Sequence, residues 1–231
     1  MSTKERYERV RAEVDLACEK AGRNPHEVLL LAVSKTVDLD QVQEAIEGGA
    51  HAFGENRPDG LLEKATAFPQ ATWHFIGNIQ SRRIPDIVRS AALVHSLFEE
   101  RHARKIDEAA AAAGKVQDVL LEVNVSGEES KGGLPMTEVY SVAEAALGLP
   151  NVRVRGLMTI PPVCADPRES RPYFEKVRAL SVDINEKLFH NEFKYLSMGM
   201  SGDFEEAIRA GATMVRVGTA IFGARNYGAA T

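Results

Sequence analysis

The sequence is poor in cysteine and has no long hydrophobic run. Only two of its 231 residues are cysteines, Cys18 and Cys164, too few for a disulfide framework or a cysteine-based zinc site. No apolar stretch reaches the roughly 18 residues that a membrane span needs, and the first residues are charged throughout, unlike a secretory signal. We therefore expect reduced thiols, no membrane association and a cytoplasmic protein.

A strong excess of basic charge is also missing. The chain has 28 Lys and Arg against 33 Asp and Glu, which gives a formal net charge of -5 at pH 7 and a pI near 5.8. Nucleic-acid binding without sequence preference normally needs a basic face, so no nucleic-acid partner is expected. No linker rich in Pro, Gly or Ser divides the chain, and we expect a single domain over residues 1–231.

Short apolar runs alternate with longer helical patterns along the chain. The expected strands cover residues 28–34, 51–54, 72–76, 93–97, 118–125, 152–159, 193–197 and 214–217. The expected helices cover residues 3–21, 39–47, 61–67, 85–90, 99–113, 136–147, 168–188, 203–210 and 220–222. Apolar strands alternating with helices are typical of a parallel sheet buried on both faces. Eight such units predict a closed (β/α)8 barrel. An open doubly wound sheet is the alternative, but no Gly-x-Gly-x-x-Gly follows the first strand.

A lysine follows the first expected strand, where the functional side chains of such barrels gather. Because side chains alternate along a strand, Leu31, Val33 and Lys35 share a face. If the two apolar residues fill the barrel, Lys35 points to its mouth, and partial burial there lowers the pKa of a lysine. An uncharged amine suits Schiff-base chemistry, whereas a lysine that extends into water is the alternative.

Two glycine-containing loops follow the seventh and eighth expected strands. The first covers residues 197–203 and reads SMGMSGD, and the second contains Gly218 and Thr219. Backbone N–H groups and helix starts in such loops bind phosphate, and phosphate sites in these barrels commonly follow these two strands. The alternative is that the glycines only make tight turns and that Ser201 only caps its helix.

Arg216 is expected inside the barrel because it alternates with Val215 and Val217. A buried arginine needs a partner, either a carboxylate or the ring nitrogen of a bound cofactor. A ring nitrogen beside an arginine stays unprotonated, so the cofactor would be a weak electron sink.

Taken together, these residues resemble the pyridoxal phosphate homeostasis proteins, a family related to the barrel domain of bacterial alanine racemase. The resemblance runs from about Leu29 to Ala224, nearly the whole chain. It is carried by seven motifs, namely AVSKT (32–36), HAFGEN (51–56), WHFIGNIQS (73–81), LEVNVSGEESKGG (121–133), RGLMTI (155–160), YLSMGMSGDFEEAI (195–208) and VRVGTAIFG (215–223).

The resemblance implies a barrel of the type III pyridoxal phosphate fold, without a second β domain. The Schiff-base lysine of the family corresponds to Lys35, the ring-nitrogen arginine to Arg216, and a pocket position beside the cofactor to Asn56. The phosphate ligands and their near neighbours correspond to Met200, Ser201, Gly202, Gly218 and Thr219.

Two segments depart from the family pattern. After FGEN the family usually continues with a helix-compatible stretch, but this chain has Arg57-Pro58-Asp59-Gly60. The proline and glycine predict that the next helix starts one turn later. The fourth expected strand reads His95-Ser96-Leu97-Phe98, where an aspartate is common near the end, so no carboxylate contact is assigned there.

Three further residues can be interpreted either as ordinary structural residues or as part of the site. Lys131, in the loop after the fifth strand, could attract the phosphate or receive the aldehyde during cofactor transfer, or it is a surface lysine. His74 lies within an apolar strand and is more simply a hydrogen-bonded core residue. Met158 is expected to pack below the cofactor, and ordinary core packing explains it equally well.

The function implied by the resemblance is that of a carrier. The protein would bind pyridoxal phosphate and buffer it or deliver it to apo enzymes that use the cofactor, as a monomer or weak homodimer. The first alternative is an amino-acid racemase, which needs acid/base groups on both faces of the substrate. In alanine racemase the second base comes from another domain and a neighbouring subunit. Here the sequence reaches Thr231 soon after the last strand, so little or no racemase activity is expected. A phosphosugar barrel enzyme is a further alternative, which the extended motif match disfavours.

Overall fold

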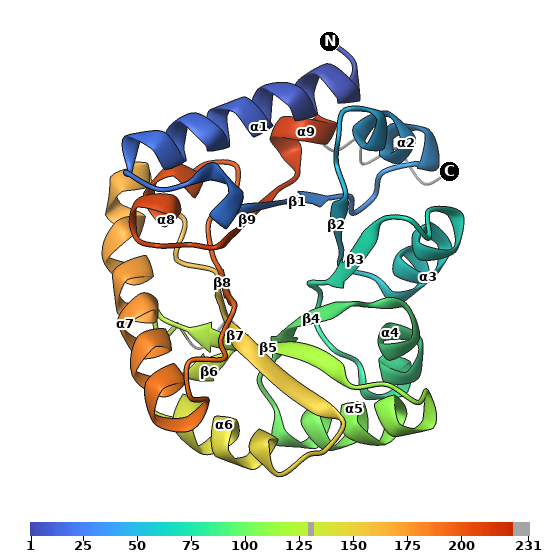
Figure 1. Cartoon of the computed structure of the whole chain (residues 1–231), viewed down its shortest axis with the longest axis vertical. Helices are drawn as coiled ribbons and strands as arrows, with labels where there is room; N and C mark the ends of the chain where they lie inside the picture. Colours follow the sequence, from blue (N-terminus) through green and yellow to red (C-terminus); the bar gives the residue numbers. More distant parts are fainter. Residues whose placement is uncertain (129–131, 224–231) are drawn as a thin grey trace.

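Eight parallel strands close into a barrel (Figure 1). In this computed structural model, residues 1–128 and 132–223 are described. The barrel strands are β1 (Leu29–Val33), β2 (Ala52–Glu55), β3 (Thr72–Phe75), β4 (Leu93–Leu97), β5 (Gln117–Asn124), β7 (Val152–Thr159), β8 (Tyr195–Ser197) and β9 (Met214–Val217). Each strand pairs in parallel with its neighbours in chain order, and the pairing of β9 with β1 closes the ring. The predicted (β/α)8 barrel is therefore confirmed.

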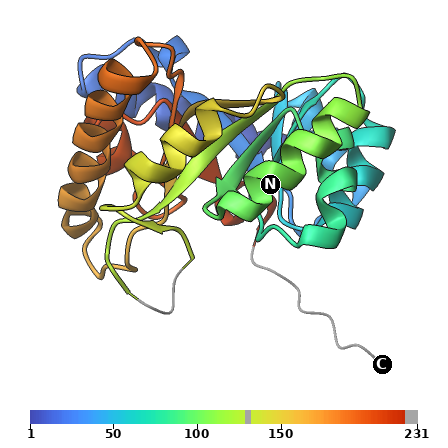
Figure 2. The ribbon, with the colours of Figure 1, turned by 90° about the horizontal axis from the view of Figure 1, so that it is seen from below.

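Helices form the outer layer around the strands, with α7 and α5 on opposite sides in Figure 2. They are α1 (Thr3–Lys20), α2 (Leu39–Glu47), α3 (Pro58–Ala67), α4 (Ile84–Ser90), α5 (Glu100–Ala112), α6 (Val139–Leu147), α7 (Arg171–Leu188), α8 (Phe204–Arg209) and α9 (Thr219–Phe222). Within the described ranges, none of these helices is long and apolar enough to cross a membrane.

The barrel interior holds a small apolar cluster that is separate from the main core. Its buried members are Leu31, Ala52, Leu93, Leu120, Met158 and Met214, contributed by six different strands. The larger core lies between the strands and the helices, and its members alternate with these residues along each strand. The interior position of Leu31 agrees with the direction predicted for the face that ends at Lys35.

Helix α3 begins at Pro58, so the prediction that it would start one turn later is wrong. Proline suits the first turn of a helix because its φ is already helical and its missing N–H would have no helical partner. Gly60 lies inside this helix, where an added Cβ would sit 3.3 Å from a carboxylate oxygen of Glu55. The space beside Gly60 is therefore tight because of packing against Glu55, and no turn is formed there.

Other differences concern the segments before helices. The two-residue strand β6 (Leu134–Pro135) pairs with β5 and was not expected, and α6 begins only at Val139. The expected helix from residue 168 begins as a 3-10 turn, Pro167–Ser170, and α7 itself starts at Arg171. Pro172 lies in the first turn of α7, where a proline is tolerated.

A β-bulge in β7 depends on Gly156. Val119 and Leu121 of β5 pair with Val154 and Leu157 of β7, so β7 carries one extra residue. Gly156 has φ +147°, and an added Cβ would lie 1.7 Å from the carbonyl oxygen of Tyr195 in the neighbouring strand. The bulge can therefore be built only around a glycine.

We expect Gly156→Ala to lower the free energy of unfolding by about 3 kcal/mol or more, because backbone on both sides must move. Urea unfolding followed by circular dichroism measures this change. Gly148→Ala is the matched control, since φ is ordinary there and the added Cβ meets nothing closer than 3.5 Å. A Gly156→Ala protein as stable as this control would contradict the assignment.

Candidate functional site

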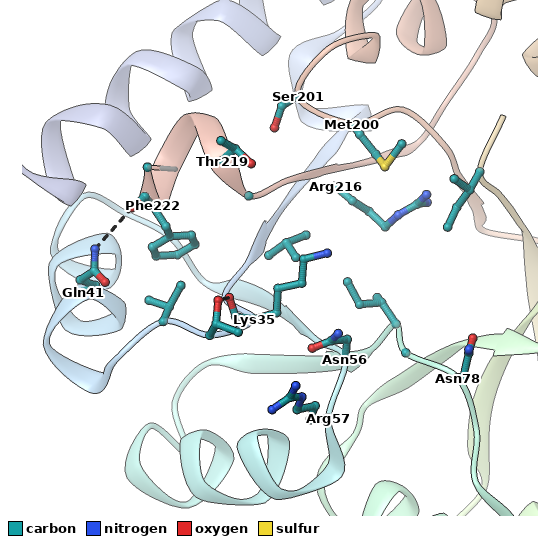
Figure 3. Close-up of a pocket in the computed structure, with 18 of the residues that line it drawn as sticks. Lys35, Gln41, Asn56, Arg57, Asn78, Met200, Ser201, Arg216, Thr219 and Phe222 are labelled. Carbon is teal, nitrogen blue, oxygen red and sulfur yellow. Dashed lines mark hydrogen bonds between the residues drawn. The ribbon is translucent and has the colours of Figure 1, made fainter. Parts of the chain in front are cut away.

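A cavity of about 820 Å³ opens at the carboxyl ends of the strands (Figure 3). It brings together the eight residues that were assigned to the cofactor site from the sequence. These are Lys35, Asn56, Met200, Ser201, Gly202, Arg216, Gly218 and Thr219. Met158, expected below the cofactor, also lines the cavity. Lys131 lies outside the described residues.

Lys35 follows β1, and its amine points into the cavity in Figure 3. The preceding residue, Ser34, is fully buried, and its N–H donates to the carbonyl of Gly54 at 3.0 Å. The following residue, Thr36, has φ +63°, a conformation that a β-branched residue rarely adopts. The chain is thus held in a strained turn on one side of Lys35 and anchored on the other, which sets the direction of its side chain.

A buried ion pair anchors this turn and was not predicted. Lys64 of α3 donates to a carboxylate oxygen of Glu55 and, at 2.6 Å, to the carbonyl oxygen of Ser34. The Ser34 hydroxyl donates to the same Glu55 oxygen at 3.0 Å. Both charged side chains are at least 95% buried, so removing either one would leave an uncompensated charge inside the protein. Neither strand pattern nor helix pattern shows that these residues meet.

The loops after β8 and β9 present free backbone donors. Among the described residues, the N–H groups of Ser201, Gly202, Gly218 and Thr219 have no hydrogen-bond acceptor in the protein. All four residues line the cavity, and Figure 3 shows the side chains of Ser201 and Thr219 at one side of it, with their hydroxyl groups pointing toward each other. Convergent backbone N–H groups of this kind bind anions. Helices α8 and α9 have only six and four residues, so the donors, not the helix dipoles, carry this property.

The loop after β8 is shaped by Asp203 and not by a Ser201 cap. The Asp203 carboxylate accepts from the N–H of Met200 at 2.6 Å, and the Met200 carbonyl accepts from Asp203 and Phe204. Gly199 has φ +93°, and an added Cβ would lie 2.5 Å from Cβ of Ala207. Asp203 therefore fixes the loop through Met200, and the Met200 N–H is not available to bind a ligand because it already donates to Asp203.

Arg216 is buried at the base of the cavity with its guanidinium anchored at two points. It donates from Nη1 to the Ser197 hydroxyl at 2.8 Å and from Nη2 to the carbonyl of Thr159 at 3.0 Å. Burial lowers the pKa of Arg216 to about 10, against the opposing effect of Glu122 and Asp203, so it stays protonated at neutral pH. The sequence-based prediction of a barrel-facing arginine is confirmed in position.

Two buried side chains of the barrel interior have pKa values shifted by burial. The pKa of Glu122 rises to about 7, and one of its oxygens has no hydrogen-bond partner among the described residues. The pKa of His74 falls to about 4, so this histidine is neutral, and its Nδ1 lies 3.0 Å from Nε2 of His95. His74 is therefore the hydrogen-bonded core residue that was expected. Glu122 was not singled out from the sequence, because a lone glutamate in an apolar strand does not show which side chains it will meet.

The rim of the cavity also includes residues to which no role was assigned from the sequence. Arg57, Asn78 and Gln80 come from the loops after β2 and β3, and Gln41 of α2 donates to the carbonyl of Phe222. In the part of the chain that the structure describes, no three His, Cys, Asp or Glu side chains form a metal site. The cavity therefore holds the Lys35 amine and the protonated Arg216 guanidinium, is rich in N–H donors, and has no metal-binding cluster in this part.

Comparison with known proteins places the chain in a family. The model of the alanine racemase N-terminal domain matches residues 7–226. The pyridoxal phosphate homeostasis protein of Aquifex aeolicus is 43% identical over 229 residues, which cover 98% of this chain and 100% of that protein.

Solved structures agree with this relationship. A crystal structure described as an unknown protein from Bifidobacterium adolescentis has a TM-score of 0.90 at 34% identity, covering 95% of this chain and 94% of its own. The protein PipY of Synechococcus elongatus, solved with pyridoxal phosphate bound, has a TM-score of 0.82 at 29% identity, covering 96% of this chain and 100% of its own. The chain therefore belongs to the alanine racemase N-terminal domain family and, within it, to the pyridoxal phosphate homeostasis proteins.

Proposed function

We propose that this protein binds pyridoxal phosphate, holds it on Lys35 as a Schiff base, and serves in the homeostasis or delivery of the cofactor. The observation that carries the proposal is the meeting of the Lys35 amine with four free backbone N–H groups in one cavity. The comparisons support it, because the curated relatives are named pyridoxal phosphate homeostasis proteins and PipY has been solved with the cofactor bound.

The residues of the cavity fit the chemical groups of this cofactor. Its phosphate is matched by the N–H groups of Ser201, Gly202, Gly218 and Thr219, with two hydroxyl groups beside them. Its aldehyde reacts with primary amines, and Lys35 supplies one within the same cavity. Its pyridine nitrogen is matched by Arg216, whose protonated guanidinium can only donate.

Arg216 argues for a carrier and against an efficient racemase. A protonated guanidinium beside the ring nitrogen disfavours protonation of that nitrogen, which weakens the cofactor as an electron sink. Racemisation also needs an acid/base group on each face of the substrate. Among the described residues that line the cavity, Asp38 is the one carboxylate, and its oxygen already caps α2 by accepting from the N–H of Gln41. No tyrosine, histidine or cysteine is part of this lining.

Release of the cofactor fits the exposure of its phosphate site. Ser201, Gly202 and Thr219 are exposed, and Lys35 is half-buried, so water and other amines reach both ends of the cavity. We propose that apo enzymes which use pyridoxal phosphate receive the cofactor from this site by exchange of the amine. We further propose that this takes place in the cytoplasm and that the carrier is a monomer or weak homodimer.

We expect borohydride to fix pyridoxal phosphate to Lys35, because reduction traps a Schiff base where it forms. Peptide mass mapping of the treated protein locates the label. Lys35→Ala should remain unlabelled under the same conditions. A label found mainly on another lysine, such as Lys64, would overturn the proposed site.

We expect phosphate recognition to dominate affinity, so pyridoxal without its phosphate should bind at least about a hundredfold more weakly. Thr219→Val removes one hydroxyl at nearly constant volume and should raise Kd for the phosphorylated form about tenfold. Absorbance titration measures both effects. Thr66→Val, the same change on an exposed threonine of α3, is the control. Equal affinity for pyridoxal and its phosphate would remove the assigned phosphate site.

We expect little or no racemase activity on free amino acids, because the second acid/base group is missing from the described lining and Arg216 weakens the electron sink. Chiral chromatography of alanine and serine incubated with cofactor-saturated protein is the measurement. Turnover of about 1 per second or faster, abolished in Lys35→Ala, would make the racemase interpretation correct.

A further inference from the structure

A chain of hydrogen bonds runs through the barrel interior behind Arg216. Nη1 of Arg216 lies 2.8 Å from Ser197 Oγ, which lies 3.2 Å from Nδ1 of His95. Nε2 of His95 lies 3.0 Å from Nδ1 of His74. The four side chains come from β9, β8, β4 and β3, and each is at least 95% buried. Strands β8 and β4 are not neighbours in the sheet, so the chain crosses the inside of the barrel.

The direction of this chain follows from Arg216. A guanidinium has no acceptor, so Ser197 Oγ must accept from it. The proton of the Ser197 hydroxyl then needs an acceptor of its own, and among the described residues Nδ1 of His95 is the one within reach. A buried hydroxyl proton without an acceptor would cost about 1–3 kcal/mol, which disfavours the reverse arrangement.

The order of donors continues through both imidazoles. Because His95 accepts at Nδ1, its single proton lies on Nε2, and it donates to Nδ1 of His74. His74 in turn carries its proton on Nε2. A second charge in this interior is disfavoured, since burial and the nearby Arg216 hold the pKa of His95 well below its ordinary value.

We propose that Ser197, His95 and His74 are positioning residues that fix the orientation of the Arg216 guanidinium toward the cofactor ring nitrogen. The proposal rests on pyridoxal phosphate being the ligand of this cavity. With Nη1 held by Ser197 and Nη2 by the Thr159 carbonyl, the guanidinium has one preferred plane. If His95 loses its acceptor nitrogen, the Ser197 hydroxyl turns to find another partner and the Nη1 anchor weakens.

The first test uses cofactor-free protein and so does not depend on the proposed function. Nitrogen-15 NMR of full-length protein labelled in histidine reports which ring nitrogen carries the proton. We expect both His74 and His95 to be neutral with the proton on Nε2 from about pH 6 to about pH 8. A proton on Nδ1 of either ring would overturn the direction of the chain.

The second test compares variants in binding of pyridoxal phosphate by absorbance. His95→Phe should raise Kd about tenfold and add a pH-dependent transition to the spectrum of the bound cofactor, whereas His95→Gln, which can both accept and donate, should stay within about threefold of the parent. His102→Phe is the control, because this buried histidine of α5 contacts Ser81 at 3.1 Å and Glu99 at 3.7 Å and is not part of the chain that leads to Arg216.

Unchanged Kd and spectrum in His95→Phe would overturn the positioning role. Should His95→Phe fail to fold, Ser197→Ala tests the same positioning role with a smaller volume change, because it removes the hydroxyl between Arg216 and His95. The same increase in Kd is expected, and an unchanged Kd and spectrum would overturn the role. If the parent protein itself does not bind pyridoxal phosphate, the proposed function fails, and the NMR result on the direction of the chain still stands.

Discussion

The parallel pairing of β1 with β9 is the contact on which the site depends. Leu31 of β1 lies opposite Arg216 of β9, and the next pair along is Ala32 with Val217. Because both strands run the same way, the loops that follow them leave the barrel side by side, and Lys35 reaches the cavity beside Gly218. The two strands approach so closely that a Cβ on Gly218 would lie 3.2 Å from a backbone oxygen. The site therefore exists only when the barrel is closed.

Burial of polar groups divides the barrel interior into two zones with different physical roles. The apolar cluster around Leu31 and Met214 contributes hydrophobic burial, whereas the groups around Arg216 cost desolvation energy and need partners. Glu122 responds to this cost by a raised pKa, and Arg216 by two hydrogen bonds and a lowered pKa. Such groups add little to stability, so their presence indicates that the mouth of the barrel is organised for a ligand.

Much of the fold was predictable because its signals are local. Eight apolar runs and the helices between them follow from residue periodicity, and the observed strands agree with the expected ones to within two residues at either end. The predicted start of α3 was wrong because Pro58 was treated as a helix breaker, although a proline in the first turn is compatible with a helix. Strand β6 was missed because two residues cannot show a periodic pattern.

The sequence alone determined the barrel class, the lysine after the first strand, the two glycine loops and the barrel-facing arginine, since each depends on the order of residues within one short segment. Tertiary structure alone decided which distant residues support them. Lys64 reaches the carbonyl before Lys35, and His95 meets Ser197, which is 102 positions away in the chain. These contacts depend on the register and tilt of strands in a closed barrel, and that geometry cannot be predicted from the local sequence around each residue.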